Sequence, residues 1–288
     1  MIEILSDFFR EERIEFYGVL PIEECKIQKD YLLNKKDFVP KSVICFLVPY
    51  YTQNGDNVSK YAVSKDYHLF MERFFEKLSK ALNKQYPQSK AYGFADHSPI
   101  HELEAAAKCG LGIIGKNRLL INEKYSSFVF IGEVFTDIDA KLLGYVSAEE
   151  IKACMKCGRC GKACPTGTLL DCTQPCLSAI TQKKGRLSEQ EIAFMIENNT
   201  VWGCDICQNV CPYTATAIKN GTIKTPIKFF YNDIIHNLTS DILDNMTDEA
   251  FNMRAYAWRK RETIRRNLIF TEEAKAENAE LQENKAKK

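Results

Sequence analysis

Nine of the twelve cysteines of this chain lie between residues 154 and 211, and seven of these nine form two short runs. The first run has the spacing Cys154-x2-Cys157-x2-Cys160-x3-Cys164-Pro. This is the spacing of bacterial ferredoxins, in which three thiolates hold one [4Fe–4S] cluster and the cysteine before proline ligates a second one. The run therefore predicts two iron–sulfur clusters rather than one.

The second run, Cys204-x2-Cys207-x3-Cys211-Pro, is one cysteine shorter. If its last cysteine mirrors the last cysteine of the first run, the first cluster is held by Cys154, Cys157, Cys160 and Cys211. The second cluster then has three ligands, Cys164, Cys204 and Cys207, and needs a fourth. Cys176 is favoured because it opens the apolar stretch CLSAI, which predicts a short helix, and Cys172 is the alternative.

Zinc and disulfides are the competing interpretations of these thiols. Zinc sites pair two CxxC units into a closed set of four thiolates, and the first run alone has too many closely spaced cysteines for that. The N-terminal sequence has early acidic residues and no long apolar run, so we expect neither a signal peptide nor a membrane span. A cytoplasmic location, where thiols stay reduced, is therefore expected. The isolated Cys45 and Cys109 are expected to be buried structural thiols.

The composition is that of an ordinary globular protein without a strong overall charge. Hydrophobic residues make up 45% of the 288 residues, charged residues make up 27%, and the net charge is +1. A nucleic-acid partner would therefore need a local basic patch. Residues 254–266 provide one candidate, because no acidic residue interrupts Arg254 to Arg261, and Tyr256 and Trp258 are interleaved for base stacking. The competing interpretation is a solvated charged helix face.

The elements that must position these residues form an alternating pattern. Strands are expected over 16–20, 42–51, 90–96 and 126–137, and helices over 1–13, 61–87 and 98–110, the last capped by Ser98. This pattern predicts an α+β protein in three parts. They are an N-terminal α/β sheet domain over 1–149, a ferredoxin-like double-cluster domain over 150–220, and a helical, basic segment with a charged, frayed tail over 221–288.

Two further stretches could bind a ligand. Asp96 ends a predicted strand, where sheet domains gather catalytic groups, although the residues alone favour a simple capping role before Ser-Pro. The stretch GLGIIGKN at 110–117 has neither P-loop nor dinucleotide spacing. A ligand contact and a plain turn are equally supported there.

Several of these motifs, taken in order, resemble the epoxyqueuosine reductases. The resemblance runs through YAVSKDYH (61–68), ADHSPIHELEAAAKCGLGIIGKNRLLI (95–121), FIGEVFTD (130–137), CMKCGRCGKACPTGTL (154–169), CLSAIT (176–181) and GCDICQNVCPY (203–213). It covers most of residues 40–215.

The resemblance implies reduction of epoxyqueuosine to queuosine in the anticodon loop of tRNA, by a cobalamin that receives electrons through two [4Fe–4S] clusters. Asp96 would be the proton donor in a D-x-x-P-x-x-E motif, which reverses the preference for a cap. The second cluster would take Cys176 rather than Cys172. The implied cobalamin contacts are Tyr61, Asp66, Asp96, Gly115, Lys116 and Asn117. The tRNA contacts expected on the basic segment are Arg254, Arg259 and Arg261.

A ferredoxin or flavodoxin is the expected electron donor, and no membrane partner is expected. Family members usually carry a longer helical tail and other residues at His97 and His101, so a cobalamin-dependent reductase of another substrate is an alternative. The alternatives from other classes are a two-cluster electron-transfer protein and a cobalamin-handling protein. Two tests discriminate among these functions: whether replacement of Asp96 abolishes turnover, and whether the protein binds a corrin.

Overall fold

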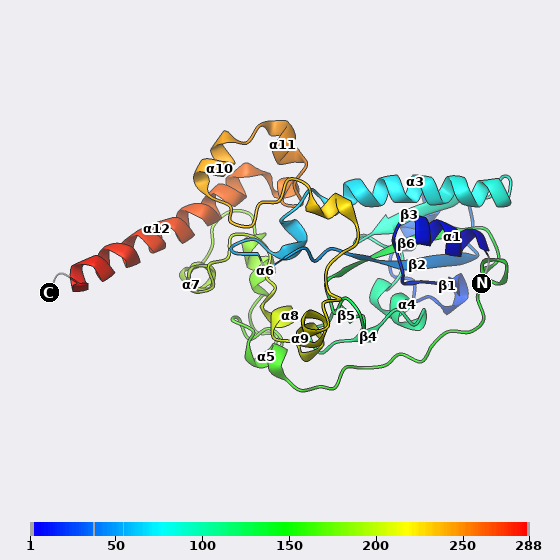
Figure 1. Cartoon of the computed structure of the whole chain (residues 1–288), viewed down its shortest axis with the longest axis horizontal. Coiled ribbons are helices and arrows are strands. Elements are labelled where there is room, and N and C mark those ends of the chain that lie inside the picture. The colour runs from blue at the N-terminus through cyan, green and yellow to red at the C-terminus, as the bar shows by residue number, and fades with distance from the viewer. Residues whose placement is uncertain (1–2, 37, 54, 287–288) are drawn as a thin grey trace. The chain divides into compact units, whose positions relative to one another are not determined.

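Four strands of the computed structural model form an antiparallel sheet in the order β1-β2-β6-β3 (Figure 1). The model describes residues 3–36, 38–53 and 55–286. The strands are β1 (Tyr17–Pro21), β2 (Ser42–Pro49), β3 (Ala91–Ala95) and β6 (Val129–Thr136). All four lie within the predicted strand regions to within a residue, because apolar, β-branched runs were a sufficient signal.

Both faces of the central strand β2 are buried, as its continuous apolar sequence predicts. On one face the Phe46 ring packs 4.5 Å from the ring of Phe74 on helix α3 (Tyr67–Gln85). On the other face Val43 and Cys45 join a core with the alanines of helix α4 (Glu102–Lys108). Helices α3 and α4 therefore lie on opposite sides of the sheet (Figure 1).

Two predicted helices are shorter than expected at their N-termini. Helix α3 begins at Tyr67 rather than near residue 61, after the 3₁₀ turn η2 (Lys60–Ala62). Helix α4 begins at Glu102, and its N-cap is His101, whose ring accepts the backbone N–H of Glu104. The predicted Ser98 cap is therefore wrong, because the Ser98 hydroxyl is engaged by a carboxyl of the sheet instead.

A small hairpin carries the stretch GLGIIGKN. Strand β4 (Ile113–Ile114) pairs with β5 (Leu120–Ile121), and the turn between them is closed by a hydrogen bond from the Gly115 N–H to the Leu119 carbonyl, with N and O 2.8 Å apart. A Cβ on Gly115 would lie 2.2 Å from the Asn117 amide oxygen, so the turn requires glycine.

The remaining helices complete two compact units, each described separately below. Their bounds are α1 (Glu3–Glu11), α2 (Asp30–Asn34), α5 (Arg159–Lys162), α6 (Leu177–Thr181), α7 (Glu189–Glu197), α8 (Ile206–Asn209), α9 (Pro212–Lys219), α10 (Ser240–Asn245), α11 (Asp248–Asn252) and α12 (Lys260–Ala286). Short 3₁₀ turns are η1 (Ile22–Glu24), η3 (Ala140–Leu143), η4 (Lys228–Tyr231) and η5 (Ala257–Arg259).

The two units are assembled from discontinuous segments of chain. The first contains residues 1–51, 68–157 and 212–229, and the second contains 52–67, 158–211 and 230–288. They therefore do not coincide with consecutive ranges such as 1–149, 150–220 and 221–288. The first unit holds the sheet, and the second holds most of the cysteines of the two runs.

The core of the second unit is built around Trp202, which is completely buried. Its indole N–H donates to the Tyr61 hydroxyl at 2.7 Å, and its ring lies edge-on to the Tyr256 ring. Asn267 of α12 is also fully buried and donates to the Thr181 and Val201 carbonyls. Segments distant in sequence are thus held together by buried hydrogen bonds.

The charged C-terminal stretch is helical rather than frayed. Helix α12 continues through it to Ala286, and the last two residues of the chain lie outside the described residues. Within the described part of the chain, no helix combines the length and apolar character needed to cross a membrane.

Candidate active pocket and cluster cysteines

Asp96 follows strand β3 directly and adopts a left-handed backbone conformation, with φ +61°. The loop after it is held by an antiparallel bridge between Ile27 and Ile100. The Pro99 carbonyl accepts the backbone N–H groups of both Gln28 and Lys29, at 2.8 and 3.0 Å. Asp96 is therefore an exposed carboxylate at the start of a well-anchored loop.

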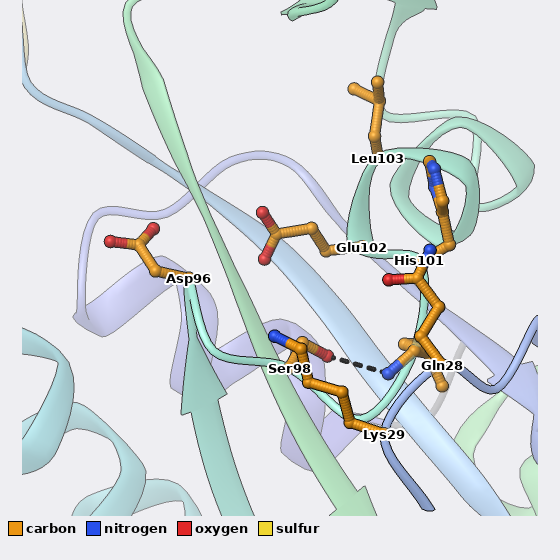
Figure 2. Close-up of a pocket in the computed structure, with 8 residues that line it drawn as sticks. Gln28, Lys29, Asp96, Ser98, His101, Glu102 and Leu103 are labelled. Atoms are coloured by element: carbon orange, nitrogen blue, oxygen red, sulfur yellow. Dashed lines mark hydrogen bonds between the residues drawn. The ribbon is translucent and has the colours of Figure 1, made fainter. Parts of the chain in front are cut away.

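Asp96 lines a pocket of about 210 Å³ in the first unit (Figure 2). The Glu102 carboxyl extends from α4 toward the side on which Asp96 lies (Figure 2). The lining residues are Gln28, Lys29, Asp96, Ser98, Ile100, His101, Glu102 and Leu103. The three motif positions Asp96, Pro99 and Glu102 thus belong to one loop and the start of one helix, and two of them face the same pocket.

Two histidines stand beside this pocket. The His68 ring, on α3, has its Nε2 atom 4.0 Å from an oxygen of the Asp96 carboxylate, and both side chains are about half exposed. The His97 ring lies between the Lys29 ammonium, at 3.3 Å, and the Tyr31 hydroxyl, at 3.1 Å. His97 therefore helps to tie the Asp96 loop to the segment before α2.

A second carboxyl lies deeper, inside the sheet. Glu133 of β6 is 1% exposed, and its carboxylate accepts the Ser98 hydroxyl. Burial raises the pKa of Glu133 to about 8; the Ser98 hydrogen bond opposes the rise and the Glu102 charge adds to it. Burial also raises the pKa of Glu102 to about 7. The Asp96 charge adds to this rise, and the Lys29 charge opposes it. The pocket is thus backed by two carboxyls that hold protons at unusually high pH.

The cysteines assigned to the second cluster are mutual neighbours within the second unit. Burial raises the pKa of the Cys204 and Cys207 thiols to about 12, and the nearby charges of Cys176, Asp205 and Cys164 add to the rise. The Cys172 thiol donates to the Thr168 carbonyl at 3.2 Å. The charges that act on Cys204 and Cys207 place Cys164 and Cys176 close to them.

The first cysteine of the other set is tied to the small hairpin. The backbone N–H of Lys116 donates to the Cys154 sulfur at 3.3 Å, and the Cys154 N–H donates to the Ile114 carbonyl at 3.0 Å. Hydrogen bonds to a ligand sulfur raise the reduction potential of a cluster. Cys157 belongs to the same unit as Cys154, whereas Cys160 and Cys211 belong to the second unit.

All twelve cysteines are free thiols, so the disulfide interpretation is not supported. Among the described residues, no three histidine, cysteine or carboxylate side chains converge on a single metal ion.

A buried ion pair flanks the second set of thiols. Asp205, between Cys204 and Cys207, accepts the Ser59 hydroxyl at 2.6 Å and the Lys60 backbone N–H at 2.7 Å, and its carboxylate lies 3.5 Å from the Lys60 ammonium. Both charged side chains are less than a tenth exposed. The pair fastens residues 59–60 to the cysteine-bearing turn, which explains why 52–67 belongs to the second unit.

The predicted cobalamin contacts fall on both units. Asp96, Gly115, Lys116 and Asn117 belong to the first unit, and Tyr61 and Asp66 to the second. Asn117 is 7% exposed, and neither polar atom of its amide has a hydrogen-bond partner in the structure. A buried amide of this kind is a ready donor and acceptor for a polar ligand group. Tyr61 is instead hydrogen-bonded to Trp202.

The three arginines of the basic segment have different environments. Arg254 is 7% exposed and donates to the carbonyl of Asp233, so it is a structural residue rather than a free phosphate ligand. Arg261 donates to two carbonyls at the end of α10, at 2.6 and 2.7 Å. Only Arg259 presents its guanidinium on an exposed aromatic ring, 3.9 Å above Trp258.

Sequence reasoning missed Glu133, Ser98 and His68. A glutamate inside the apolar strand sequence FVFIGEVF was a usable signal, because a charge at an inward position of a buried strand needs a reason. His68 lay within the quoted stretch YAVSKDYH but gave no signal of its own, because its approach to Asp96 depends on how α3 packs on the sheet.

The sheet with its acidic pocket and the thiol-rich second unit define an iron–sulfur protein of mixed α/β fold. Residues 153–214 match the 4Fe-4S double cluster binding domain family, and residues 38–97 match the family described as Epoxyqueuosine reductase QueG, DUF1730. The epoxyqueuosine reductase of Gloeobacter violaceus is 30% identical over 236 residues, covering 78% of this chain and 72% of that protein. That of Leadbetterella byssophila is 30% identical over 243 residues, covering 81% and 78%. The chain belongs to the epoxyqueuosine reductase family.

Solved structures agree with this assignment. The epoxyqueuosine reductase from Streptococcus thermophilus superposes with a TM-score of 0.73 at 25% identity, covering 93% of this chain and 80% of that one. An epoxyqueuosine reductase solved with an epoxyqueuosine-modified tRNA-Tyr stem loop has the same fold, with a TM-score of 0.69 at 19% identity, covering 93% and 80%.

We predict that the two candidate fourth ligands differ in iron content. Cys176→Ser should lose a large part of the iron and of the visible cluster absorption, because it removes a thiolate from a four-thiolate set. Cys172→Ser, the matched control, should keep the full content after anaerobic reconstitution. Iron analysis and electron paramagnetic resonance measure the difference, and equal iron in the two variants would contradict the assignment.

We also predict that Glu133→Gln stabilises the protein by an amount that grows as the pH rises from 4.5 to about 8. The folded-state pKa of about 8 lies above the ordinary value of 4.5, so ionisation is penalised in the folded state. Stability conferred by this group is full below pH 4.5 and falls as the pH rises toward 8. The variant should therefore gain about 2–4 kcal/mol at pH 8 and little near pH 5. Denaturant titrations at both pH values test this, and a gain independent of pH would refute it.

Proposed function

We propose that this protein reduces the epoxide of epoxyqueuosine in tRNA to the alkene of queuosine. The observation that carries the proposal is the combination, in one chain of this family, of an acidic pocket headed by Asp96 with eight suitably spaced cysteines. The reaction consumes two electrons, which a protein without a redox centre cannot supply. The double-cluster family match over residues 153–214 provides that centre.

Two [4Fe–4S] clusters are the proposed electron carriers. We assign Cys154, Cys157, Cys160 and Cys211 to one cluster and Cys164, Cys176, Cys204 and Cys207 to the other. Support comes from the ferredoxin spacing and from the electrostatic proximity of the four thiols of the second set. An external low-potential donor, of the ferredoxin or flavodoxin class, would reduce them.

Cobalamin is the proposed cofactor. When bound, it would supply the low-potential cobalt chemistry that reductive opening of an epoxide requires. The residues fit such a ligand in two respects: Asn117 offers an unpaired buried amide, and the glycine-dependent turn beside it allows close backbone approach. The proposed contacts are Tyr61, Asp66, Asp96, Gly115, Lys116 and Asn117.

Asp96 is the proposed proton donor for the epoxide oxygen. It is exposed and lies at the mouth of the pocket, on a loop that backbone hydrogen bonds fix to the segment 26–29. A positioned acid lowers the barrier to loss of the oxygen by neutralising the charge that develops on it. The loop anchor holds the carboxyl where a substrate in the pocket would meet it.

tRNA is the proposed carrier of the substrate, bound through its anticodon loop. A protein of this fold has been crystallised with an epoxyqueuosine-modified tRNA-Tyr stem loop. Arg259, whose guanidinium stacks on the exposed Trp258 ring, is the proposed contact of the basic segment, since a stacked cation can meet both a base and a phosphate. The substrate and the electron donor are both expected in the cytoplasm.

Replacement of Asp96 tests the proposed reaction directly. Anaerobically reconstituted protein, supplied with corrin and a strong reductant, should convert epoxyqueuosine in tRNA to queuosine, as read by mass spectrometry of the nucleosides. Asp96→Asn should lower turnover by about 10²-fold or more while leaving cluster reduction intact. Asp7→Asn, on α1, is the control variant. Asp66 is not used for this purpose because it is itself a proposed cobalamin contact. Wild-type activity in Asp96→Asn would refute the donor role.

Charge reversal at Arg259 tests the tRNA contact. Arg259→Glu should weaken tRNA binding and make log Kd less steep against log[salt] by at least about 1, because a phosphate contact is lost. Arg10→Glu, on exposed α1, is the control for a general change in charge. An unchanged salt slope would place the tRNA contact elsewhere.

A further inference from the structure

Reduction of an epoxide to an alkene needs two protons as well as two electrons. Both carbon–oxygen bonds break, a carbon–carbon double bond forms, and the oxygen leaves as water. The electrons come from the external donor through the clusters, as proposed above. Asp96 carries one proton per turnover, so a second proton must reach the same oxygen from another group or from solvent.

The pocket contains a second acid in a suitable place. Glu102 is the first residue of α4, is only partly exposed, and lines the same pocket as Asp96 (Figure 2). The loop between them is rigidly held, since the Pro99 carbonyl and the His101 N–H both pair with the backbone of segment 26–29. The two carboxyls are therefore held beside one pocket by backbone contacts rather than by flexible side chains.

The charges around Glu102 favour the protonated acid. Asp96 repels its carboxylate, and Lys29 is the opposing cation. The Lys29 ammonium is also engaged with the His97 ring, at 3.3 Å. His101 lines the same pocket and uses one ring nitrogen to accept the Glu104 N–H. The effects of burial and of the Asp96 charge on the pKa of Glu102 thus outweigh the effect of Lys29, which also contacts His97.

Behind Glu102 stands a carboxyl with no exposure to solvent. Glu133 is held by the Ser98 hydroxyl through one oxygen, and its other oxygen is buried without a hydrogen-bond partner in the structure. The Glu102 charge raises the pKa of Glu133, so the two groups are electrostatic neighbours. Ser98 itself lines the pocket and accepts the Ile100 N–H at 3.2 Å.

We propose that Glu102 is a second acid of this site, which supplies the second proton of the reaction, and that the Glu133–Ser98 pair positions it by anchoring the loop through the Ile100 N–H. The inference rests on the proposed function. In each turnover the proton leaves the Glu102 carboxyl for the departing oxygen or for the Asp96 carboxylate, and solvent at the pocket mouth restores it. A carboxyl that titrates near neutral pH is suited to both steps.

Glu102→Gln tests the role, because it keeps the shape of the side chain and removes the acid. We expect its turnover on epoxyqueuosine-containing tRNA to fall by about 10²-fold, with tRNA affinity and cluster reduction unchanged. The wild-type rate should fall as the pH rises through about 7, where Glu102 loses its proton, and the variant should lack this decrease. Glu102→Asp, which retains an acid, should recover part of the rate.

Glu104→Gln is the matched control, since Glu104 lies on the same helix but pairs with Lys108, at 3.3 Å, outside the pocket. It should keep both the rate and its pH dependence. If Glu102→Gln behaves like Glu104→Gln in an active wild-type background, the inference is wrong.

Infrared difference spectroscopy gives a readout that does not depend on turnover. A carbonyl band of a protonated carboxylic acid that titrates near pH 7 should be present in the purified wild type and in Glu104→Gln and missing from Glu102→Gln, whereas the band of Glu133, which titrates near pH 8, should remain in all three. A wild type that reduces no epoxyqueuosine would overturn the proposed function, and the band that titrates near pH 7 would still decide whether Glu102 holds a proton. Persistence of that band in Glu102→Gln would overturn the inference.

Discussion

The hydrogen bond from Ser98 to Glu133 is the constraint on which the pocket depends. A carboxyl inside a packed sheet is costly unless a polar group satisfies it, and among the described residues the Ser98 hydroxyl is the side chain that does so. The same hydroxyl accepts the Ile100 N–H, which fixes the turn after Asp96. Asp96 can therefore hold a left-handed conformation at an exposed position, because the residues after it are anchored from the interior.

Local sequence patterns predicted which helices and strands exist better than they predicted the residues at which these begin and end. The apolar run of β2 and the periodic pattern of α3 specified a strand and a helix, because burial on two faces or on one face leaves a direct record in sequence. The start of α4 was predicted wrongly, because Ser-Pro is a strong local capping signal. That signal lost to Glu133, thirty-five residues away, and a preference of about 1 kcal/mol for a cap is smaller than the cost of an unsatisfied buried carboxyl.

Some features of the site likewise follow from local sequence, and others depend on tertiary packing. Cysteine spacing is local, so the ferredoxin-like assignment followed from the residues themselves. The environment of Arg254 depends on tertiary packing. The three arginines proposed as tRNA contacts are equivalent as charges in the sequence, yet Arg254 is buried against backbone carbonyls. Asn117 is a similar case, since only the folded hairpin leaves its amide both buried and unpaired. Burial of polar groups is decided by packing partners that a single sequence does not display.

The electrostatics of the two units differ in a way that suits their separate tasks. Beside the pocket, like charges and burial work together, so protons are retained and can be donated. Beside the second set of thiols, the buried Lys60 and Asp205 compensate each other, and several hydrogen bonds hold the carboxylate in place.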